Sequence, residues 1–311
     1  MSQPYLRRRA LDNSHWYMGH LASALATTAD NGGVLAVSDI TLRGDAAPPA
    51  YCLAHEEEAL FILDGHFEGW AGETRLSGEP GDLLHLPKGQ PHAWRVLPGA
   101  DGATARALAI AVPGRLANLY ARCSEPAQSL TLPDPDPQKL QETAAQVRAG
   151  AEAFGITWMP PGYTPAALSN PAPPLPCISL LGEQFRPLAV AAQTNGAFTA
   201  MEWLSPAQSG LPKHLHQDAD EVFYILEGAV AITAGDDFSV VATPGDFVFL
   251  PKGLAHTHRA TGGQPSRAFQ LLTPGGIEAG LAEVAALAPE ELTPQRLAEC
   301  AARANLTLLP D

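Results

Sequence analysis

Charged side chains are scarce in this chain, and basic ones are the scarcest. Only 17% of the 311 residues are charged, and 33 acidic residues outnumber 19 basic ones, giving a net charge of −14. Nucleic acids and anionic membranes attract proteins through basic surfaces, so we expect neither as a partner. The one basic cluster, Arg7-Arg8-Arg9, is not followed by a continuous apolar segment, and no stretch approaches 18 uninterrupted apolar residues. The sequence therefore predicts neither a targeting peptide nor a membrane span.

Cysteine is also rare. The chain has four cysteines, Cys52, Cys123, Cys177 and Cys300, which are widely separated and form no CxxC pair. This spacing argues against a disulfide framework and against a zinc ribbon. Reduced thiols and a cytoplasmic location are the expectation.

Long helical segments are the third scarce feature, because glycine and proline interrupt the chain throughout. There are 28 glycines and 29 prolines, while 46% of the residues are hydrophobic. This composition favours a packed core built from many short strands joined by tight turns. The length allows two domains of ordinary size.

The sequence consists of two copies of one unit. Glu58–Gly65 (EALFILDG) matches Glu221–Gly228 (EVFYILEG) at an offset of 163 residues. Further pairs match at an offset of 164: Gly81-Asp82 with Gly245-Asp246, Pro87-Lys88-Gly89 with Pro251-Lys252-Gly253, and His92 with His256. Matches that keep register over such a length indicate a duplicated fold.

Each unit is predicted to be a β module followed by a short helical tail. In the second unit, Glu221–Glu227, Ala229–Thr233 and Asp246–Leu250 are short apolar runs bounded by glycine or proline, which is typical of an antiparallel sandwich or barrel. The Pro-rich segment Pro160–Pro176 is interpreted as an extended linker. We therefore predict an all-β protein with domains at 1–165 and 166–311.

Three histidines and a glutamate in the second unit have the spacing of a metal site. His214 and His216 are two residues apart, so on a strand they point to the same face. Glu221 follows after four residues, and His256 comes from a distant predicted strand. Such nitrogen and oxygen ligands suit one divalent Fe, Mn, Ni, Cu or Zn ion. Four protein ligands on a six-coordinate ion leave two positions open, as catalysis requires.

These residues and their spacing to Gly228, Gly245, Pro251 and Gly253 resemble the two signature motifs of the cupin superfamily. The one departure is Ala260, where the family pattern has asparagine. The resemblance implies that each unit is a cupin jelly-roll barrel. The alternative is that these histidines only pack or cap.

The first unit departs much further from the pattern. Tyr51-Cys52-Leu53 stands where the two histidines belong, while Glu58 and His92 keep their register. We interpret this site as degenerate. The alternative is a weakly held ion bound through Tyr51, His55, Glu58 and His92, because His55 lies two residues beyond Leu53 and would share its face.

His258 lies two residues after the ligand candidate His256 and is predicted to face the same way. It is therefore a candidate for contact with the substrate or with the metal ligands. The alternative is a histidine at the barrel mouth that meets solvent.

Within the two-domain cupins, the chain resembles the bacterial quercetin 2,3-dioxygenase-like proteins. The resemblance rests on HWYMGHLASALATTADNGG near the start, on TPGGIE (Thr273–Glu278) and on the helical tails. It implies a metal-dependent dioxygenase that acts with O2 on a flavonol-like or other enol or hydroxyketone small molecule. Glu221 would serve as both ligand and catalytic base, and catalysis would belong to the second barrel alone.

Two alternatives stay open at the level of sequence. One is a different cupin enzyme, a decarboxylase, isomerase or lyase, since the same ligands serve any Lewis-acid chemistry. The other is a non-catalytic small-molecule-binding protein that uses the barrel as a container. Exposed barrel edges and helical tails would allow a homodimer; the alternative is that the two units of one chain pair with each other.

Overall fold

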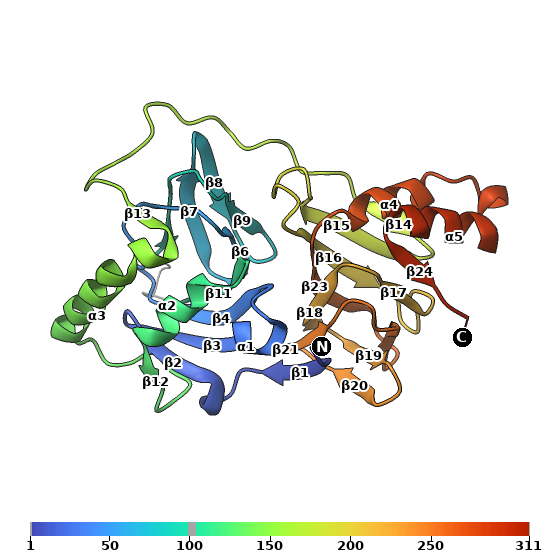
Figure 1. The fold of residues 1–311 in the computed structure, drawn as a ribbon, viewed down its shortest axis with the longest axis horizontal. Helices are drawn as coiled ribbons and strands as arrows, with labels where there is room; N and C mark the ends of the chain where they lie inside the picture. Colours follow the sequence, from blue (N-terminus) through green and yellow to red (C-terminus); the bar gives the residue numbers. More distant parts are fainter. Residues whose placement is uncertain (1, 99–103, 311) are drawn as a thin grey trace. The chain divides into compact units, whose positions relative to one another are not determined.

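The computed structural model describes residues 2–98 and 104–310 and divides into two compact units. One unit comprises Arg9–Pro173, and the other comprises Pro174 to the C-terminal end together with the first eight residues. Each unit contains a seven-stranded sheet and a five-stranded sheet (Figure 1). The prediction of a mostly β protein made of two jelly-roll barrels is confirmed.

The first unit places its strands in two antiparallel sheets. The seven-stranded sheet has the order β12 (Glu125–Pro126), β2 (Ser14–Tyr17), β3 (His20–Ala26), β4 (Ala36–Leu42), β11 (Ala105–Val112), β6 (Glu57–Asp64) and β9 (Leu83–Leu86). The five-stranded sheet has the order β13 (Ile156–Trp158), β5 (Tyr51–Leu53), β10 (His92–Leu97), β7 (His66–Ala71) and β8 (Thr74–Gly78). Its helical segments are η1 (Leu11–Asn13), α1 (Thr28–Asn31), α2 (Leu116–Arg122), α3 (Pro137–Gly150) and η2 (Glu152–Phe154).

The second unit repeats this plan. Its seven-stranded sheet has the order β1 (Tyr5–Arg8), β21 (Asp246–Leu250), β18 (Asp220–Glu227), β23 (Ser266–Thr273), β16 (Thr199–Ser205), β15 (Glu183–Ala189) and β14 (Ile178–Leu180). Its five-stranded sheet has the order β20 (Phe238–Ala242), β19 (Ala229–Ala234), β22 (His256–Thr261), β17 (His214–His216) and β24 (Leu306–Leu308). The helices are α4 (Ile277–Ala285), η3 (Pro289–Glu291) and α5 (Pro294–Arg303), which form the predicted tail.

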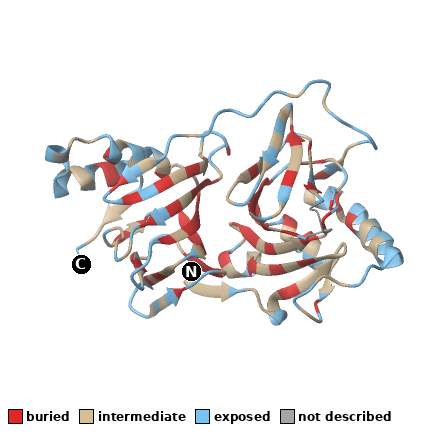
Figure 2. Cartoon of the chain, turned by 180° about the vertical axis from the view of Figure 1, so that it is seen from behind, coloured by how far each residue is buried: buried red, intermediate tan, exposed pale blue. Residues whose placement is uncertain are grey.

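Apolar side chains from both sheets of the second unit meet in one core. Phe223 and Val248 come from the seven-stranded sheet and Val230 and Ile232 from the five-stranded sheet, and all four are fully buried. Burial in both units follows the strands, whereas α3 is largely exposed (Figure 2). Burying such side chains stabilises the fold by about 1.5–3 kcal/mol each, which fixes the strands that carry the site.

The unit boundary differs from the predicted one in two respects. The division falls after Pro173 rather than after residue 165, because the Pro-rich segment packs on the first unit. Ser169 pairs with Glu73 and Arg75 through the backbone, and the Tyr163 ring lies 5.7 Å from Trp70. Proline content alone does not indicate which unit an extended segment contacts.

The second difference concerns the N-terminal segment, which belongs to the second unit. Strand β1 extends the seven-stranded sheet by pairing with β21. Tyr5 stacks on Phe249 with a ring separation of 5.3 Å, and Arg8 forms an ion pair of 2.8 Å with Asp246. This pairing joins residues more than 230 positions apart, so no local pattern predicted it.

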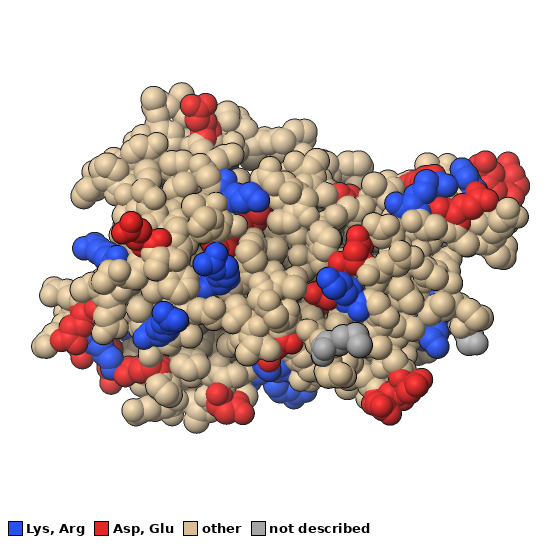
Figure 3. All heavy atoms as spheres, viewed as in Figure 1, with Lys and Arg blue, Asp and Glu red and all other residues tan. Residues whose placement is uncertain are grey.

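Charge on the surface is mixed. On the face drawn in Figure 3, Lys and Arg side chains are scattered among Asp and Glu and form no continuous basic patch. None of the helices in the described part of the chain is long and apolar enough to cross a membrane.

A buried carboxylate in the second unit gives a test of stability. Glu183 is fully buried and accepts hydrogen bonds from Trp203 Nε1 at 2.7 Å, Ser205 Oγ at 3.0 Å and Ser209 Oγ at 2.6 Å. We expect Glu183→Leu to lower the free energy of unfolding by about 2–4 kcal/mol, because an unsatisfied buried donor costs about 1–3 kcal/mol. Urea denaturation followed by circular dichroism measures the change. The matched control Glu227→Leu removes an exposed carboxylate and is expected to cost about 1 kcal/mol or less; equal losses in both variants would contradict the prediction.

Candidate metal centre

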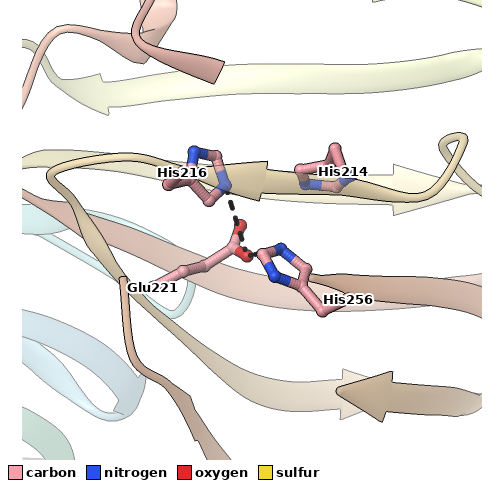
Figure 4. A group of neighbouring side chains, drawn as sticks. All are labelled: His214, His216, Glu221 and His256. Carbon is pink, nitrogen blue, oxygen red and sulfur yellow. Dashed lines mark ion pairs between the residues drawn. The ribbon is translucent and has the colours of Figure 1, made fainter. Parts of the chain in front are cut away.

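Strand pairing brings the predicted ligands of the second unit together. His214 and His216 lie on β17, both buried and on the same face of the strand. The backbone of His214 pairs with His256 on β22, while Glu221 comes from β18 in the other sheet. Figure 4 shows the four side chains pointing toward one another, with Glu221 between His216 and His256. The cluster therefore bridges the two sheets inside the barrel.

The four groups converge on a common point. One ligand atom from each residue can be chosen so that all lie within 4.8 Å of one another. His256 Nε2 lies 3.0 Å and His216 Nε2 lies 3.6 Å from Glu221 Oε2. Metal-bound nitrogen and oxygen atoms lie at about 2.0–2.2 Å from the ion, so atoms this close to one another fit around a single cation.

Hydrogen bonds on the far side of two imidazoles fix which nitrogen faces the centre. His214 Nδ1 lies 2.8 Å from the carbonyl oxygen of Pro212, and His256 Nδ1 lies 2.8 Å from that of Leu254. A carbonyl can only accept, so each Nδ1 donates its proton and each Nε2 keeps a lone pair. This second contact is typical of metal-binding histidines.

The atoms that face the centre lack hydrogen-bond partners among the described residues. His216 Nε2, His256 Nε2 and Glu221 Oε2 are buried and have no hydrogen-bond partner, although both nitrogens lie within ion-pair distance of the oxygen. Leaving such atoms unpaired costs about 1–3 kcal/mol each. A cation at this point would satisfy all three at once, so the residues present fit a divalent metal ion.

The charges of the cluster also suit a cation. Burial alone would raise the pKa of Glu221, but His216 and His256 outweigh burial and hold that pKa well below its ordinary value. Burial lowers the pKa of His214 well below its ordinary value, which keeps this imidazole neutral. Burial would lower the pKa of His256, but the hydrogen bond and the charge of Glu221 outweigh burial and raise that pKa. Metal binding would therefore displace a proton from this pair, since a ligand imidazole must be neutral.

Gln270 is a contact of the cluster that the sequence analysis did not single out. Its Nε2 donates a hydrogen bond of 2.5 Å to Glu221 Oε1, the carboxylate oxygen on the side away from the imidazoles. Both side chains are buried. The available signal was a glutamine inside the otherwise apolar run AFQLL of β23.

His258 lies beside the cluster inside the barrel. It does not meet solvent at the barrel mouth, which was the alternative considered from the sequence. It is fully buried, its ring lies 5.9 Å from that of His214, and it packs against Trp203 and Phe223 at 4.9 Å. Burial lowers the pKa of His258 to about 4. The imidazole is therefore neutral near pH 7.

The equivalent point of the first unit is closed by a tyrosine. Tyr51 on β5 donates a hydrogen bond of 2.6 Å to Glu58 Oε2 on β6, and its ring meets His92 edge-on at 4.3 Å. His92 Nε2 lies 3.8 Å from the same carboxylate oxygen. The Tyr51 hydroxyl is thus hydrogen-bonded to the Glu58 oxygen that faces the imidazole of His92. The corresponding oxygen of the second unit, Glu221 Oε2, has no hydrogen-bond partner.

His55, proposed above as a substitute ligand in the first unit, does not join this group. It is exposed, and its ring lies near Gly155, whereas Leu53 is fully buried. The inference from alternation was wrong because the strand β5 ends at Leu53, after which the two-residue period no longer applies. Tyr51, Glu58 and His92 are brought together, and His55 is not.

A small apolar chamber of about 70 Å³ lies next to the cluster in the second unit. Its wall includes Leu211, Ile277, Leu281 and Leu297, so the helical tail forms one side of it. His214 is the only polar residue among the described residues that line it. Pockets that hold drug-sized molecules measure about 300–1,000 Å³, so this chamber as it stands admits only a small apolar group.

A second space of about 60 Å³ also lies beside the cluster. It is lined by His216 together with Asp218, Ile277 and Asn305. Asn305 Nδ2 donates a hydrogen bond of 2.9 Å to Asp218. Both spaces belong to the second unit.

Comparisons with known proteins agree with this geometry. Residues 201–272, which contain all four residues of the cluster, match the cupin domain family. A quercetin 2,3-dioxygenase of Bacillus subtilis (strain 168) is 24% identical over 273 residues, covering 82% of this chain and 78% of the relative.

Solved structures with the same fold include oxalate decarboxylases. That of Bacillus subtilis, which has Mn(II) centres, shares 14% identity at a TM-score of 0.59 and covers 89% of this chain and 78% of its own. That of Lactobacillus farciminis, in a formate complex, shares 15% identity at a TM-score of 0.54, with 87% of each chain covered. Residues 201–272 therefore match a cupin domain, and the chain shares the fold of these structures and has a buried histidine–glutamate cluster able to hold a metal ion.

The closed cluster of the first unit predicts a pH effect on stability. Burial raises the pKa of Glu58 to about 7, although the hydrogen bond from Tyr51 lowers it in part. The folded state therefore keeps a proton that the unfolded chain releases above about pH 4.5. This contribution is full below pH 4.5 and is lost as the pH rises through 7.

We expect the stability of the metal-free wild type, relative to Glu58→Gln, to fall by up to ~3 kcal/mol between pH 4.5 and 7. Chemical denaturation of chelator-treated protein across this range measures the difference. The control is Glu68→Gln on β7, which removes a partly exposed carboxylate. The free energy of unfolding of this variant should change with pH in parallel with that of the wild type. A constant difference between wild type and Glu58→Gln would contradict the prediction.

Proposed function

We propose that this protein is a metal-dependent dioxygenase of the quercetin 2,3-dioxygenase type, acting in its second barrel on an apolar enol or hydroxyketone. The observation that carries the proposal is the buried four-residue cluster, which has beside it a small apolar chamber partly lined by His214. The similarity to a quercetin 2,3-dioxygenase over 82% of the chain supports the same reaction class.

The chamber favours an apolar substrate over a small dianion such as oxalate. Carboxylates are held in protein sites by Arg or Lys side chains, which supply charge-assisted hydrogen bonds. The described residues that line the chamber include no Arg or Lys. An apolar group of a substrate would bury its surface there at a gain of about 25 cal/mol per Å².

Each residue of the site has a distinct task in this proposal. His214, His216, Glu221 and His256 would hold the ion, which supplies Lewis-acid and one-electron chemistry toward O2 when bound. Glu221 is the candidate base for the substrate hydroxyl, because its Oε2 faces the centre of the cluster. The apolar wall excludes water, and His258, neutral and buried beside His214, is a candidate for substrate contact.

Catalysis belongs to the second barrel alone in this proposal. The first barrel has lost two imidazoles, and the hydroxyl of Tyr51 already occupies Glu58. The expected metal stoichiometry is therefore one ion per chain. The ion is one of Fe, Mn, Ni, Cu or Zn, since histidine and carboxylate ligands accept each of these.

Elemental analysis of purified variants tests this assignment. We expect about one metal ion per chain in the wild type and in His92→Ala, and far less in His256→Ala. The reason is that His256 belongs to the open cluster of the second barrel, whereas His92 lies in the first barrel. Oxygen consumption with quercetin should follow the same order. Metal retained in His256→Ala and lost in His92→Ala would overturn the assignment, and two ions per wild-type chain would show that the first barrel also binds metal.

Two other functions remain distinguishable by experiment. A different cupin reaction would consume substrate without consuming O2, and the similarity in fold to oxalate decarboxylases makes oxalate the first compound to compare. A binding protein would take up the ligand without turnover after reconstitution with Fe, Mn, Ni or Cu. Oxygen electrode and product analysis on the same samples separate the three outcomes.

The chamber gives a separate prediction on substrate affinity. Leu281→Trp fills the chamber from the α4 side, so we expect KM for quercetin to rise about tenfold or more, since pocket misfits cost about 1–3 kcal/mol. Metal content should stay at the wild-type level, because Leu281 is not part of the cluster. Leu204→Trp, at a partly exposed position on β16, is the control and should leave both quantities unchanged. An unchanged KM in Leu281→Trp would show that substrate binds elsewhere.

A further inference from the structure

Gln270 is the only described side chain that hydrogen-bonds the carboxylate of Glu221 from outside the imidazole cluster. Its Nε2 donates to Oε1, and the same glutamate presents Oε2 to His216 and His256. The two carboxylate oxygens therefore have different environments. One is hydrogen-bonded to an amide, and the other is unpaired and faces the imidazoles.

The orientation of the Gln270 amide follows from the carboxylate. An ionised carboxylate only accepts hydrogen bonds, so the amide must present its NH2 group and not its oxygen. The oxygen of Gln270 is left buried with no hydrogen-bond partner in the described part of the chain. Retaining a buried unpaired acceptor costs about 1–3 kcal/mol, so a side chain chosen for core stability alone would be apolar.

The first unit shows what this strand position looks like without an open cluster. Gln270 lies two residues before Leu272, which pairs with Glu221. In the first unit Ala111 pairs with Glu58, so the equivalent of Gln270 is Ala109. There Glu58 receives its hydrogen bond from Tyr51, on the side where the imidazoles would be. The amide is therefore present only in the barrel whose carboxylate faces three imidazoles.

We propose that Gln270 is a positioning residue that fixes the rotamer of Glu221 and limits it to one oxygen at the metal. The inference rests on the metal site of the proposed function. A glutamate side chain has three rotatable bonds, and an anchored Oε1 leaves Oε2 as the oxygen available to the cation. Contacts of this kind outside the ligand set change metal affinity by about tenfold to a hundredfold.

The test measures metal binding directly and does not depend on turnover. Gln270→Met keeps the length and volume of the side chain but removes the donor. We expect the dissociation constant for Co(II), measured by competition with a chromophoric chelator, to rise about tenfold to a hundredfold. The visible absorption spectrum of the Co(II) protein should also change, because a released carboxylate alters the number or geometry of its oxygen ligands.

Two further variants separate positioning from packing. Gln270→Ala introduces the residue found at the equivalent position of the first barrel and should show the same spectral change even if it is less stable. Met201→Leu alters the residue opposite Gln270 on β16 without touching Glu221, and should leave the dissociation constant and the spectrum unchanged. Circular dichroism of the metal-free proteins establishes that each variant is folded.

The outcomes distinguish this inference from the proposed function. Wild-type affinity and an unaltered Co(II) spectrum in a folded Gln270→Met or Gln270→Ala would overturn the positioning role and leave the metal site intact. Absence of stoichiometric Co(II) binding in the wild type would overturn the metal site itself. Equal loss of affinity in Met201→Leu would assign the effect to packing and would also overturn the inference.

Discussion

The structure of the second barrel depends on one buried carboxylate. Glu221 is almost fully excluded from solvent, and an ionised carboxylate at such depth is costly unless positive charge or hydrogen bonds compensate it. Gln270 satisfies one oxygen, and the other lies 3.6 Å from His216 Nε2 and 3.0 Å from His256 Nε2 with no hydrogen-bond partner among the described residues. A cation bound between these groups would satisfy the second oxygen of Glu221. The packing of the core around the site and the binding of the ion would therefore be coupled.

The two barrels show how the same fold can keep or lose such a site. Both retain the glutamate and the last histidine, and both retain the order of strands around them. The differences lie in the side chains that face the barrel interior. In the first barrel, Tyr51 replaces an imidazole by a phenol that hydrogen-bonds Glu58, so the carboxylate is satisfied without an ion. The strands can stay in place because the backbone ladder does not depend on these side chains.

The helical tail of the second barrel helps to enclose a small apolar space beside the cluster. Helices α4 and α5 and strand β24 complete the wall of a chamber that reaches His214. The tail therefore supplies part of the apolar surface next to the cluster. Among the described residues, the lining of this chamber carries no Arg or Lys, which are the side chains that hold carboxylates in protein sites.

The sequence alone determined the duplicated β fold and the four residues of the cluster. These features depend on short-range spacing: a two-residue period puts His214 and His216 on one face, and apolar runs between glycines define strands such as Asp246–Leu250. Tertiary structure decided the rest. The exclusion of His55, the amide of Gln270 beside Glu221, the chamber under the helical tail and the pairing of β1 with β21 each join segments distant in the chain, or depend on where a strand ends. Such contacts are set by packing in three dimensions, which leaves no periodic pattern in the sequence.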